Sequence, residues 1–404
     1  MPGSLYMTTA VSKMLVRLNR MIGNSPETSA VLRSAFGFMD RRIAEIVAEM
    51  KKQEKKGAHH LYPSNVACDY LYVSALAQRS PTADIRYLIS LLEKNSTALS
   101  IYGKANSAVI LSAFGKPAKA KEYLQSLSEY TVFREDIGRY FDTPKALSSW
   151  FDYRIPTQVA AIEAIKALQP DKTGEIDEMK RWLLQEKRTQ SWDTPINSVE
   201  AVYAFLDGQH PTNLAAKEEA VIRLDGTRMD LSAATAGLGY VKGSVTGKTP
   251  KTLTIDKSSD GTSWGAVYAQ YFQASSAVTD HAAGFTIMRE LIGADRLKVG
   301  DRVRVRITVQ ADRDYDFVQI VDKRAACMEP VRQLSGYHNG YYCSPRDHAT
   351  SYYFDRLPKG KHVIETEYYL DRSGTYQTGT CTVQCAYSPE FMARTAAKQL
   401  VIHQ

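Results

Sequence analysis

Four nine-residue segments decide how the first half of the chain folds: DYLYVSALA (69–77), SAVILSAFG (107–115), AAIEAIKAL (160–168) and SVEAVYAFL (198–206). All four alternate small and apolar residues, and equivalent alanines recur 38, 54 and 37 residues apart. These alanines are Ala75, Ala113, Ala167 and Ala204. A repeat of about 38 residues is the length of two helices and their turns. The pattern predicts helical hairpins over residues 1–208, as in solenoids and closed α/α toroids, with small residues where helices approach closely.

The longest expected helix in this half covers residues 28–56 and is amphipathic. Its last turns carry four lysines, Lys51, Lys52, Lys55 and Lys56, and Gly57 follows them. Cations near a helix C-terminus interact favourably with the helix dipole, and glycine suits the position after the last turn. This charge run is therefore interpreted as a solvated helix end and not as a nucleic-acid patch.

The periodicity of the sequence changes after about residue 209. The segment RVRVRITVQ (302–310) alternates basic and apolar residues, which is typical of a strand with one wet face. In it the valines and Ile307 should face one way, and the arginines and Thr308 the other. Residues 316–322, 362–370 and 380–387 also read as strands with turn signals between them. Short strands with regular turns predict antiparallel β-sandwich domains.

These patterns divide the chain into three expected domains: 1–208, a partial α/α toroid; 209–294, a small β-domain; and 295–404, a β-sandwich. In the second domain, TLTI (252–255) and WGAVYAQYFQ (264–273) are the clearest strands, and Ala294-Asp295 is the expected boundary. In the third, Leu357 should point inward while residues 358–360 turn the chain into the next strand. The predicted fold class is multidomain α plus β.

Charge and hydropathy exclude several classes of protein. The chain has 51 Lys and Arg against 44 Asp and Glu, a net charge of +7 spread over 404 residues, so no nucleic-acid partner is expected. The N-terminal stretch MPGSLYMTTAVSKML lacks the basic and apolar regions of a signal peptide. No run of 18 or more apolar residues occurs, so we expect no transmembrane segment.

Five cysteines are too few, and odd in number, for a disulfide scaffold. Cys381 and Cys385 should lie on the same face of a strand, too far apart along it to bond to each other. For Cys327 and Cys343, two readings stay open, a disulfide between them or separate buried thiols. Cys68 is the cysteine of the helical half.

Phosphate-binding motifs fail on spacing. GSVTGKT, at residues 243–249, is one residue short of a P-loop and lies in a β-rich region. Gly237 and Gly239 begin a G-x-G, but Lys242 stands where the dinucleotide fingerprint needs glycine. No nucleotide cofactor is expected.

Metal motifs also fail. A calcium loop starting near Asp256, with Asp260-Gly261 inside it, would need a ligand at Val267, so a hairpin turn is the better interpretation. His59 and His60 are adjacent and would face different ways on a helix. We expect no metal site and no cofactor.

Two groups of residues could carry catalysis. Cys343, Asp347 and His348 lie close in sequence and could form a thiolate–imidazole pair, although a loop between strands is the simpler reading. An α/α toroid can also hold a glycosidase, which needs paired carboxylates at its mouth. The candidates by position are Glu135, Asp136, Asp142 and Asp193, and acidic residues in such turns are usually caps. We therefore assign no catalytic residue.

The C-terminal third resembles the last domain of bacterial alpha-2-macroglobulins. The resemblance rests on residues 301–337 and 352–395: a strand ending in V-Q, an alanine-rich step into Glu329-Pro330, F-D-R-L-P-K-G before a strand, and the ending Tyr387-Ser-Pro-Glu-Phe391. Upstream, residues 191–206 and the first 15 residues resemble the family's thioester-type helical domain. Residues 264–273 resemble the CUB-type β-domain into which that helical domain is inserted.

The resemblance implies a protein that traps proteases. In the family a bait region is cleaved, the molecule rearranges, and in many members a Cys–Gln thioester acylates the protease. That thioester needs a glutamine three residues after a cysteine, but Cys68 is followed by Asp69-Tyr70-Leu71. We therefore expect the C-terminal fragment of an alpha-2-macroglobulin-like inhibitor that starts inside its toroid, carries no thioester and is not an enzyme.

The implied partners are target proteases, through the full-length protein, and upstream macroglobulin domains of the same polypeptide. The implied location is the periplasm or cell surface, through an upstream lipoprotein signal. Two alternatives stay open: a glycosidase-like α/α-toroid enzyme with accessory β-domains, and a cell-surface interaction module. A deep pocket lined with carboxylates would favour the enzyme.

Overall fold

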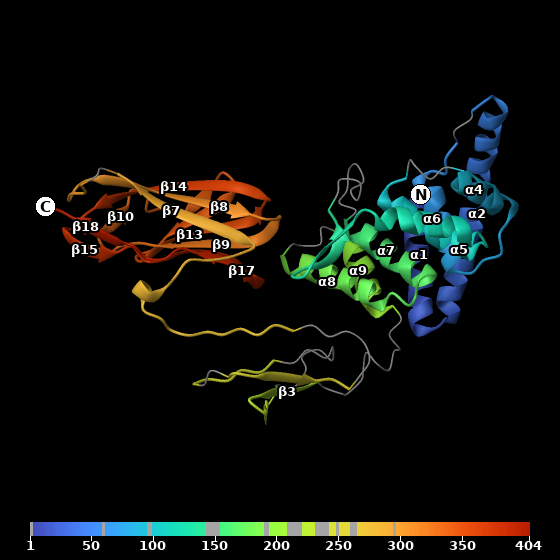
Figure 1. The fold of residues 1–404 in the computed structure, drawn as a ribbon. Helices are drawn as coiled ribbons and strands as arrows, with labels where there is room; N and C mark the ends of the chain where they lie inside the picture. Colours follow the sequence, from blue (N-terminus) through green and yellow to red (C-terminus); the bar gives the residue numbers. More distant parts are fainter. Residues whose placement is uncertain are drawn as a thin grey trace. The chain divides into compact units, whose positions relative to one another are not determined.

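The computed structural model describes residues 3–58, 61–94, 99–142, 154–189, 194–207, 220–230, 242–247, 250–258, 265–293 and 296–404. The chain divides into two compact units, one of residues 1–183 and 193–265, the other of residues 184–192 and 266–404. Helices dominate the first unit and antiparallel strands the second (Figure 1). The predicted α-plus-β class, with helices first and sheets later, is confirmed.

The described α-helices are α1 (Leu5–Ile22), α2 (Pro26–Lys55), α3 (Asn65–Leu76), α4 (Ala83–Lys94), α5 (Ile101–Ala113), α6 (Pro117–Ser128), α7 (Arg154–Leu168), α8 (Thr173–Thr189) and α9 (Pro195–Leu206). Several start where a serine or threonine side chain accepts the backbone N–H three residues on, which satisfies a donor the helix leaves free. These N-caps are Ser4, Ser25, Ser64, Ser100 and Thr194. The helix expected over residues 28–56 is α2.

The helices form two layers. The odd-numbered ones contact one another in a cycle, α1 to α3, α5, α7, α9 and back to α1, and so build an inner ring. The ring helices α3, α5 and α7 are buried on nearly all sides, whereas α2, α4 and α6 are amphipathic and pack outside them. The predicted α/α toroid is this ring, and all four repeated segments lie in its helices.

Two details of the helical half differ from expectation. The alanines at equivalent places are not equivalent in packing, because Ala75 and Ala204 are buried but Ala113 and Ala167 lie exposed near helix ends. Two other alanines of the same segments, Ala108 and Ala161, are fully buried. Residues 131–141 form a hairpin of β1 (Thr131–Arg134) and β2 (Gly138–Phe141) within a stretch expected to be helical.

The described residues of the middle region form a small antiparallel sheet in the order β4-β3-β5, from β3 (Val221–Leu224), β4 (Thr227–Arg228) and β5 (Leu253–Asp256). The strand expected at TLTI is β5. The strand expected at 264–273 is wrong for its described part, since residues 265–273 are exposed and contain no strand. Its aromatic pattern suits a strand, but no partner strand meets it among the described residues. The expected boundary at 294–295 and the 208–219 junction lie outside them.

The second unit is a sandwich whose strands are β6 (His281–Ala283), β7 (Phe285–Ile292), β8 (Arg302–Ala311), β9 (Tyr315–Lys323), β10 (Met328–Pro330), β11 (Gly336–His338), β12 (Tyr341–Pro345), β13 (Ala349–Leu357), β14 (Gly360–Leu370), β15 (Gly374–Gln377), β16 (Cys381–Cys385), β17 (Ser388–Arg394) and β18 (Gln399–Ile402). One sheet has the order β10-β14-β8-β7 and the other β11-β12-β13-β9-β16-β17-β6. Strands β15 and β18 pair separately. Because β6 and β7 pair with β17 and β8, the sandwich starts before residue 295, where we expected it to begin.

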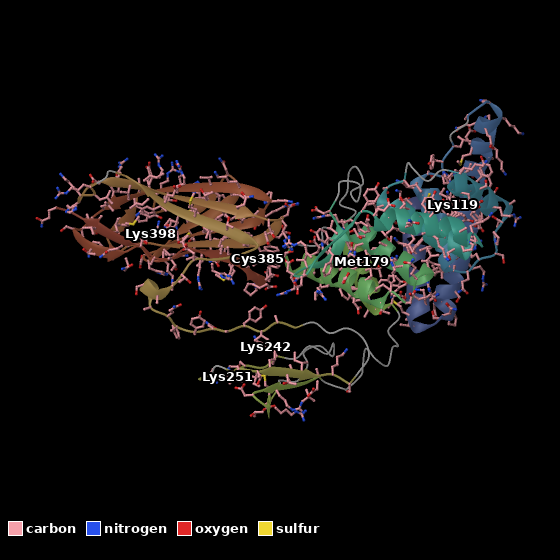
Figure 2. The ribbon with its side chains drawn as sticks, viewed as in Figure 1. Lys119, Met179, Lys242, Lys251, Cys385 and Lys398 are labelled. Carbon is pink, nitrogen blue, oxygen red and sulfur yellow. The ribbon has the colours of Figure 1, made fainter. Side chains whose placement is uncertain are left out.

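The core of the sandwich follows the predicted alternation. In β8 the valines, Ile307 and Ala311 are buried, while the arginines and Thr308 lie on the outer face. Leu357 is fully buried, and residues 358–360 turn the chain from β13 into β14, with Gly360 at a left-handed φ of 127°. Figure 2 draws the side chains of both units, with Met179 labelled among the helices and Cys385 and Lys398 in the sandwich.

No described helix is long and apolar enough to cross a membrane.

Candidate functional site: a buried ionic cluster inside the helical ring

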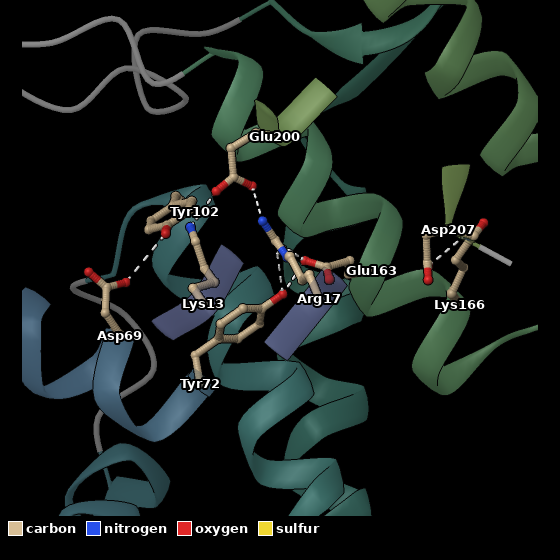
Figure 3. Close-up of polar contacts among 9 residues, drawn as sticks. All are labelled: Lys13, Arg17, Asp69, Tyr72, Tyr102, Glu163, Lys166, Glu200 and Asp207. Carbon is tan, nitrogen blue, oxygen red and sulfur yellow. Dashed lines mark hydrogen bonds and ion pairs between the residues drawn. The ribbon is translucent and has the colours of Figure 1, made fainter. Parts of the chain in front are cut away.

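Charged and phenolic side chains from every helix of the inner ring converge in its interior (Figure 3). They are Lys13 and Arg17 of α1, Asp69 and Tyr72 of α3, Tyr102 of α5, Glu163 of α7 and Glu200 of α9. Helices α1 and α7 are not neighbours in the ring, yet Arg17 bonds to Glu163. That contact crosses the interior of the ring, so we call this group the axial cluster.

Arg17 is the centre of the axial cluster. Its Nη1 donates to Glu200 Oε2 at 2.5 Å and its Nη2 to Glu163 Oε2 at 2.6 Å. The same Nη2 lies 3.3 Å from the Tyr72 hydroxyl, which donates to Glu163. The guanidinium also lies over the ring of Tyr203, 4.3 Å from its centroid. One arginine thereby ties α1 to α3, α7 and α9.

The cluster is almost closed to water, which sets its electrostatics. Arg17 is 4%, Glu163 8% and Glu200 2% exposed. Burial alone would raise the pKa of Glu200, but Arg17 and Lys13 outweigh it and lower this pKa to about 2. Burial, followed by the charge of Glu163, raises the pKa of Tyr72 well above its usual value. Glu200 is therefore ionised and Tyr72 protonated at neutral pH.

A second set of contacts continues from the cluster on the side of α3 and α5. Lys13 forms an ion pair with the other oxygen of Glu200, and its side chain is 13% exposed. The Tyr102 hydroxyl donates to Asp69 at 3.4 Å. Burial raises the pKa of Asp69, with Lys13 acting in the opposite direction. The charges are thus arranged as alternating cations and carboxylates.

This arrangement suits fixing helices better than proton transfer. A general acid or base needs a proton that it can exchange near neutral pH, but Glu200 is held ionised far from that range. Glu163 is engaged by Arg17 and Tyr72. Removing one partner from a buried ion pair leaves an uncompensated charge, which is strongly destabilising. The cluster therefore makes each inner helix depend on the others.

Sequence reasoning missed this cluster, although a signal was present. Glu163 and Glu200 lie among small and apolar residues in two of the repeated segments, the first of which also contains Lys166. A charged residue at a position where the rest of the segment is core-forming is seldom buried without a partner. Lys13 and Arg17, four residues apart on α1, supply the partners.

The thiol candidates are separated or inert. Cys343 is buried in β12, while Asp347 and His348 are exposed in the turn before β13, and within residues 341–349, all of which are described, no hydrogen bond joins the thiol to the imidazole. Burial raises the pKa of Cys343. Cys327 and Cys343 are both free, which decides between the two readings left open. Cys381 and Cys385 share the buried face of β16, as expected.

Two cysteines bear on thioester chemistry. Burial raises the pKa of Cys68 to about 12, so its thiol stays protonated. Cys381 does have a glutamine three residues on, Gln384, a spacing that sequence reasoning overlooked. Both residues lie in strand β16, where residues three apart point to opposite faces. Cys381 is buried, whereas Gln384 lies on the outer face and reaches the Pro389 carbonyl at 3.5 Å.

The acidic candidates do not line a common site. Glu135 and Asp136 are exposed in the β1–β2 turn, where Asp136 pairs with Arg134 at 2.8 Å, and Asp142 is exposed after β2. Asp193 lies outside the described residues, as do His59, His60, Gly237, Gly239, Lys248, Thr249 and Asp260-Gly261. Asp256 pairs with Arg223 across two strands, and Val267 is exposed. Among the described residues no group of His, Cys, Asp and Glu could hold a metal ion.

Comparison with known families gives the class of the C-terminal sandwich. Residues 271–390 match the family model described as the Bacterial Alpha-2-macroglobulin MG10 domain. This range covers most of the two segments whose sequence resembled that family. The C-terminal part of the chain is therefore similar to a bacterial alpha-2-macroglobulin domain. No curated protein matches the chain.

Solved structures of such proteins are also similar to the chain. Trypsin-activated alpha-2-macroglobulin from Escherichia coli is 15% identical over 100% of this chain, with a TM-score of 0.43. The Escherichia coli protein activated by porcine elastase is 16% identical over 92%, with a TM-score of 0.41. The native Escherichia coli fragment from domain MG7 to the C-terminus is 14% identical over 100%, with a TM-score of 0.32. This chain spans 28%, 34% and 64% of the lengths of those three chains.

Proposed function

We propose that this chain is the C-terminal part of a bacterial alpha-2-macroglobulin-like protease trap, and that it carries no thioester of its own. The observation that carries the proposal is the match of residues 271–390 to the MG10 domain. An α/α ring ahead of that domain agrees with the helical part the resemblance implies. Protease trapping belongs to the longer protein, whose bait region and other macroglobulin domains would lie upstream.

The parts would divide the work as follows. Residues 1–208 would be the remaining part of a thioester-type helical domain, 209–265 what remains of a CUB-like domain, and 266–404 the terminal sandwich, which begins before the boundary expected at residue 295. The axial cluster would hold the helical domain as one rigid piece during the rearrangement that encloses a protease. Target proteases and upstream domains of the same polypeptide are the partners, in the periplasm or on the cell surface, anchored through an upstream lipoprotein signal.

The helical ring gives little support to the glycosidase-like alternative. Of the three carboxylates in the axial cluster, Glu163 and Glu200 are both bound to Arg17, and Asp69 accepts a hydrogen bond from Tyr102. A glycosidase needs one carboxyl that is protonated near neutral pH and one that is free to attack or to activate water. A cell-surface interaction module remains the second candidate function, since it would need neither a protonated carboxyl nor a free carboxylate.

The first experiment reads the gene upstream of codon 1 and expresses the longest product found. We expect macroglobulin domains and a bait segment there. In that product, trypsin should lose activity on a protein substrate but keep it on a small peptide substrate, because an enclosed protease admits only small molecules. If no coding sequence continued upstream of Met1 in the same reading frame, the trap would be refuted. If cleavage of the protein and the peptide substrate were inhibited equally, the protein would be an active-site inhibitor.

The second experiment tests the missing thioester in this chain alone. The protein is treated with methylamine, then with a thiol reagent, and its intact mass is measured. We expect no amine addition and the same thiol labelling with and without amine, since Cys68 is a protonated thiol and Cys381 points away from Gln384. A cysteine that becomes reactive only after amine treatment, and not in the corresponding Cys→Ala variant, would contradict this.

A further inference from the structure

The turn between β11 and β12 carries the sequence Asn339-Gly340 at the outer edge of the larger sheet of the sandwich. The two strands pair as far as His338 and Tyr341, so Asn339 and Gly340 alone form the loop, and both are exposed. The chain has eight asparagines, and Asn339 is the one that a glycine follows. Asparagine amides are among the thermolabile groups of proteins. The local structure therefore decides whether this amide can react.

Three features leave Asn339 open to attack by the backbone nitrogen of the next residue. Gly340 has no side chain to hinder the approach. The space around it is open, since an added Cβ would meet no atom within 4 Å. Within residues 336–345, all of which are described, no hydrogen bond engages the Asn339 side-chain amide or the Gly340 N–H. The side-chain carbonyl carbon and the backbone nitrogen can therefore approach each other without breaking a contact.

The backbone of this turn is not the one that hairpins prefer. Two-residue Asn-Gly loops favour the type I′ turn, in which both residues take positive φ and the turn matches the twist of the strands. Here Gly340 has a φ of 88°, whereas the φ of Asn339 is not positive. Turns of the other hand splay the strands that they join, and β11 is only three residues long. The fold thus holds this loop less firmly than it would hold a regular hairpin turn.

We propose that Asn339-Gly340 is a self-modifying site, where asparagine is converted without an enzyme into aspartate and isoaspartate. The Gly340 nitrogen attacks Cγ of Asn339, which forms an N–Cγ bond and breaks the Cγ–Nδ2 bond. The side-chain nitrogen leaves as ammonia, with the proton that the Gly340 nitrogen gives up. Water then opens the cyclic imide at either carbonyl carbon, so the main chain runs through C in the aspartate and through Cγ in the isoaspartate.

The isoaspartate form would change the edge of the sheet. Its main chain is longer by one carbon atom, which a two-residue loop between paired strands cannot absorb without disturbing their register. In the described sheet β11 pairs with β12 alone, and the rings of Tyr337 and Tyr342 meet across this pair, 5.0 Å apart at their centroids. Loss of the pairing would leave β12, with its five residues, as the new edge. Both products also add a negative charge to the turn.

The first test follows the site in the folded 404-residue protein, which is kept in warm, mildly alkaline buffer for several weeks. Trypsin then releases residues 333–346, in which Asn339 is the sole asparagine, and residues 21–33, which contain Asn24. Asn24 is the matched control, because it is also exposed but precedes Ser25, whose N–H donates to Thr28 Oγ1 at 3.2 Å. We expect the first peptide to gain one mass unit at least about tenfold faster than the second. A methyltransferase specific for isoaspartate should label it.

The second test separates the glycine from the asparagine. Gly340→Ala places a methyl group beside the attacking nitrogen in open space, and should slow the conversion at least about tenfold. Circular dichroism checks that this variant is folded. Hydrogen exchange of β12 should quicken in the aged protein but not in fresh Asn339→Asp, which gains the charge and keeps the normal main chain.

Equal conversion of Asn339 and Asn24 would overturn the proposal, whether or not Gly340→Ala is folded. An unchanged rate in a folded Gly340→Ala variant would overturn it too, because the attack would then not depend on the open glycine. Unchanged exchange of β12 in protein that carries isoaspartate would refute the effect on the sheet edge. The proposed protease trap does not enter these readouts.

Discussion

Each unit of the molecule has a carboxylate buried in its core, and the pKa values of these two carboxylates are shifted in opposite directions. In the helical ring, Glu200 receives Arg17 and Lys13 on its two oxygens, and its pKa falls to about 2. In the sandwich, Asp322 of β9 is fully buried and faces Arg289 of β7 across the two sheets. Burial raises the pKa of Asp322 to about 6, despite that arginine.

The difference comes from the number of cations more than from their distance. Arg289 Nε lies 2.7 Å from Asp322 Oδ1 and is the cation paired with Asp322 among the described residues. Glu200, in contrast, is paired with both Arg17 and Lys13, one on each oxygen. The charge of one cation does not outweigh the burial of Asp322, whereas two cations outweigh the burial of Glu200. Buried ion pairs hold the helices of the ring together, whereas the buried carboxylate of Asp322 does not hold the sandwich together.

Removing Arg17 should give the largest effect. In Arg17→Met, Glu163 and Glu200 remain in the ring without their shared cation, which should cost roughly 3–5 kcal/mol. Urea unfolding measures it, followed by fluorescence in a background where Trp182, which is buried in α8, is the sole tryptophan. Arg20→Met, on the same helix but exposed, is the control and should change stability by less than about 0.5 kcal/mol. Equal effects of the two changes would mean that the cluster does not hold the ring.

The pH dependence of the two units should have opposite signs. Glu200 has a lowered folded pKa, so its stabilisation is present above 4.5 and is lost as pH falls toward 2, by about 3 kcal/mol. Asp322 has a raised folded pKa, so its protonated form contributes stability to the sandwich below 3.8, and this contribution of about 3 kcal/mol is lost as pH rises through 6.

Two reporters separate these profiles: fluorescence in a background where Trp182 is the sole tryptophan for the ring, and dithiodipyridine labelling in a background where buried Cys381 is the sole cysteine for the sandwich. Glu200→Gln should flatten the first profile and Asp322→Asn the second. Asp355→Asn, an exposed carboxylate of β13, should alter neither. A sandwich that becomes less stable on acidification from pH 6 to 4 would show that Asp322 is compensated in the same way as Glu200.

Gly284 allows a test of packing in the sandwich that does not involve charge. It has a left-handed φ of 74°, and an added Cβ would collide with the Tyr315 hydroxyl and the Phe391 ring. Gly284→Ala should therefore cost about 2–3 kcal/mol, combining backbone strain with the clash. Gly340→Ala has a similar φ of 88° with open space around it, and should cost about 1 kcal/mol. Indistinguishable melting temperatures would mean that the Tyr315 site adapts.

The smallest expected effect is that of one hydroxyl in the axial cluster. Tyr72→Phe removes the donor to Glu163 but keeps the ring and the Arg17 bonds. We expect a loss of about 1–2 kcal/mol in the same unfolding assay. Tyr6→Phe, at a half-exposed position on α1, should be neutral. A loss as large as that in Arg17→Met would place the tyrosine, and not the arginine, at the centre of the network.

The fold could be predicted wherever local pattern and tertiary burial agree. The alternation in β8 and the inward position of Leu357 follow from period two, and the inner ring helices from the repeat of small and apolar residues. Residues 265–273 have the same kind of pattern but no strand, because a strand also needs a partner that local sequence does not show. The hairpin at residues 131–141 was not predicted, because the pairing of its two strands defines it and the strand propensity of its residues does not.

The site was harder to predict than the fold because its members are distant in sequence. Arg17 and Glu200 are 183 residues apart, and only closure of the ring brings them together. The same limit applies to Cys381 and Gln384, where spacing alone suggests a thioester and the pleat of β16 separates the two side chains. Spacing becomes informative about chemistry only once the secondary structure is known.

The edges of the two sheets have a consequence for how the protein behaves at high concentration. Three of the four edge strands, β6, β10 and β11, are only three residues long, so they offer few free backbone groups to another molecule. The fourth, β7, is eight residues long but carries two adjacent charged residues, Arg289 and Glu290. Short and charged edges oppose the growth of intermolecular sheets. A crowded solution of this chain should therefore resist fibril formation, and the edge of β7 is where a destabilising mutation would first allow it.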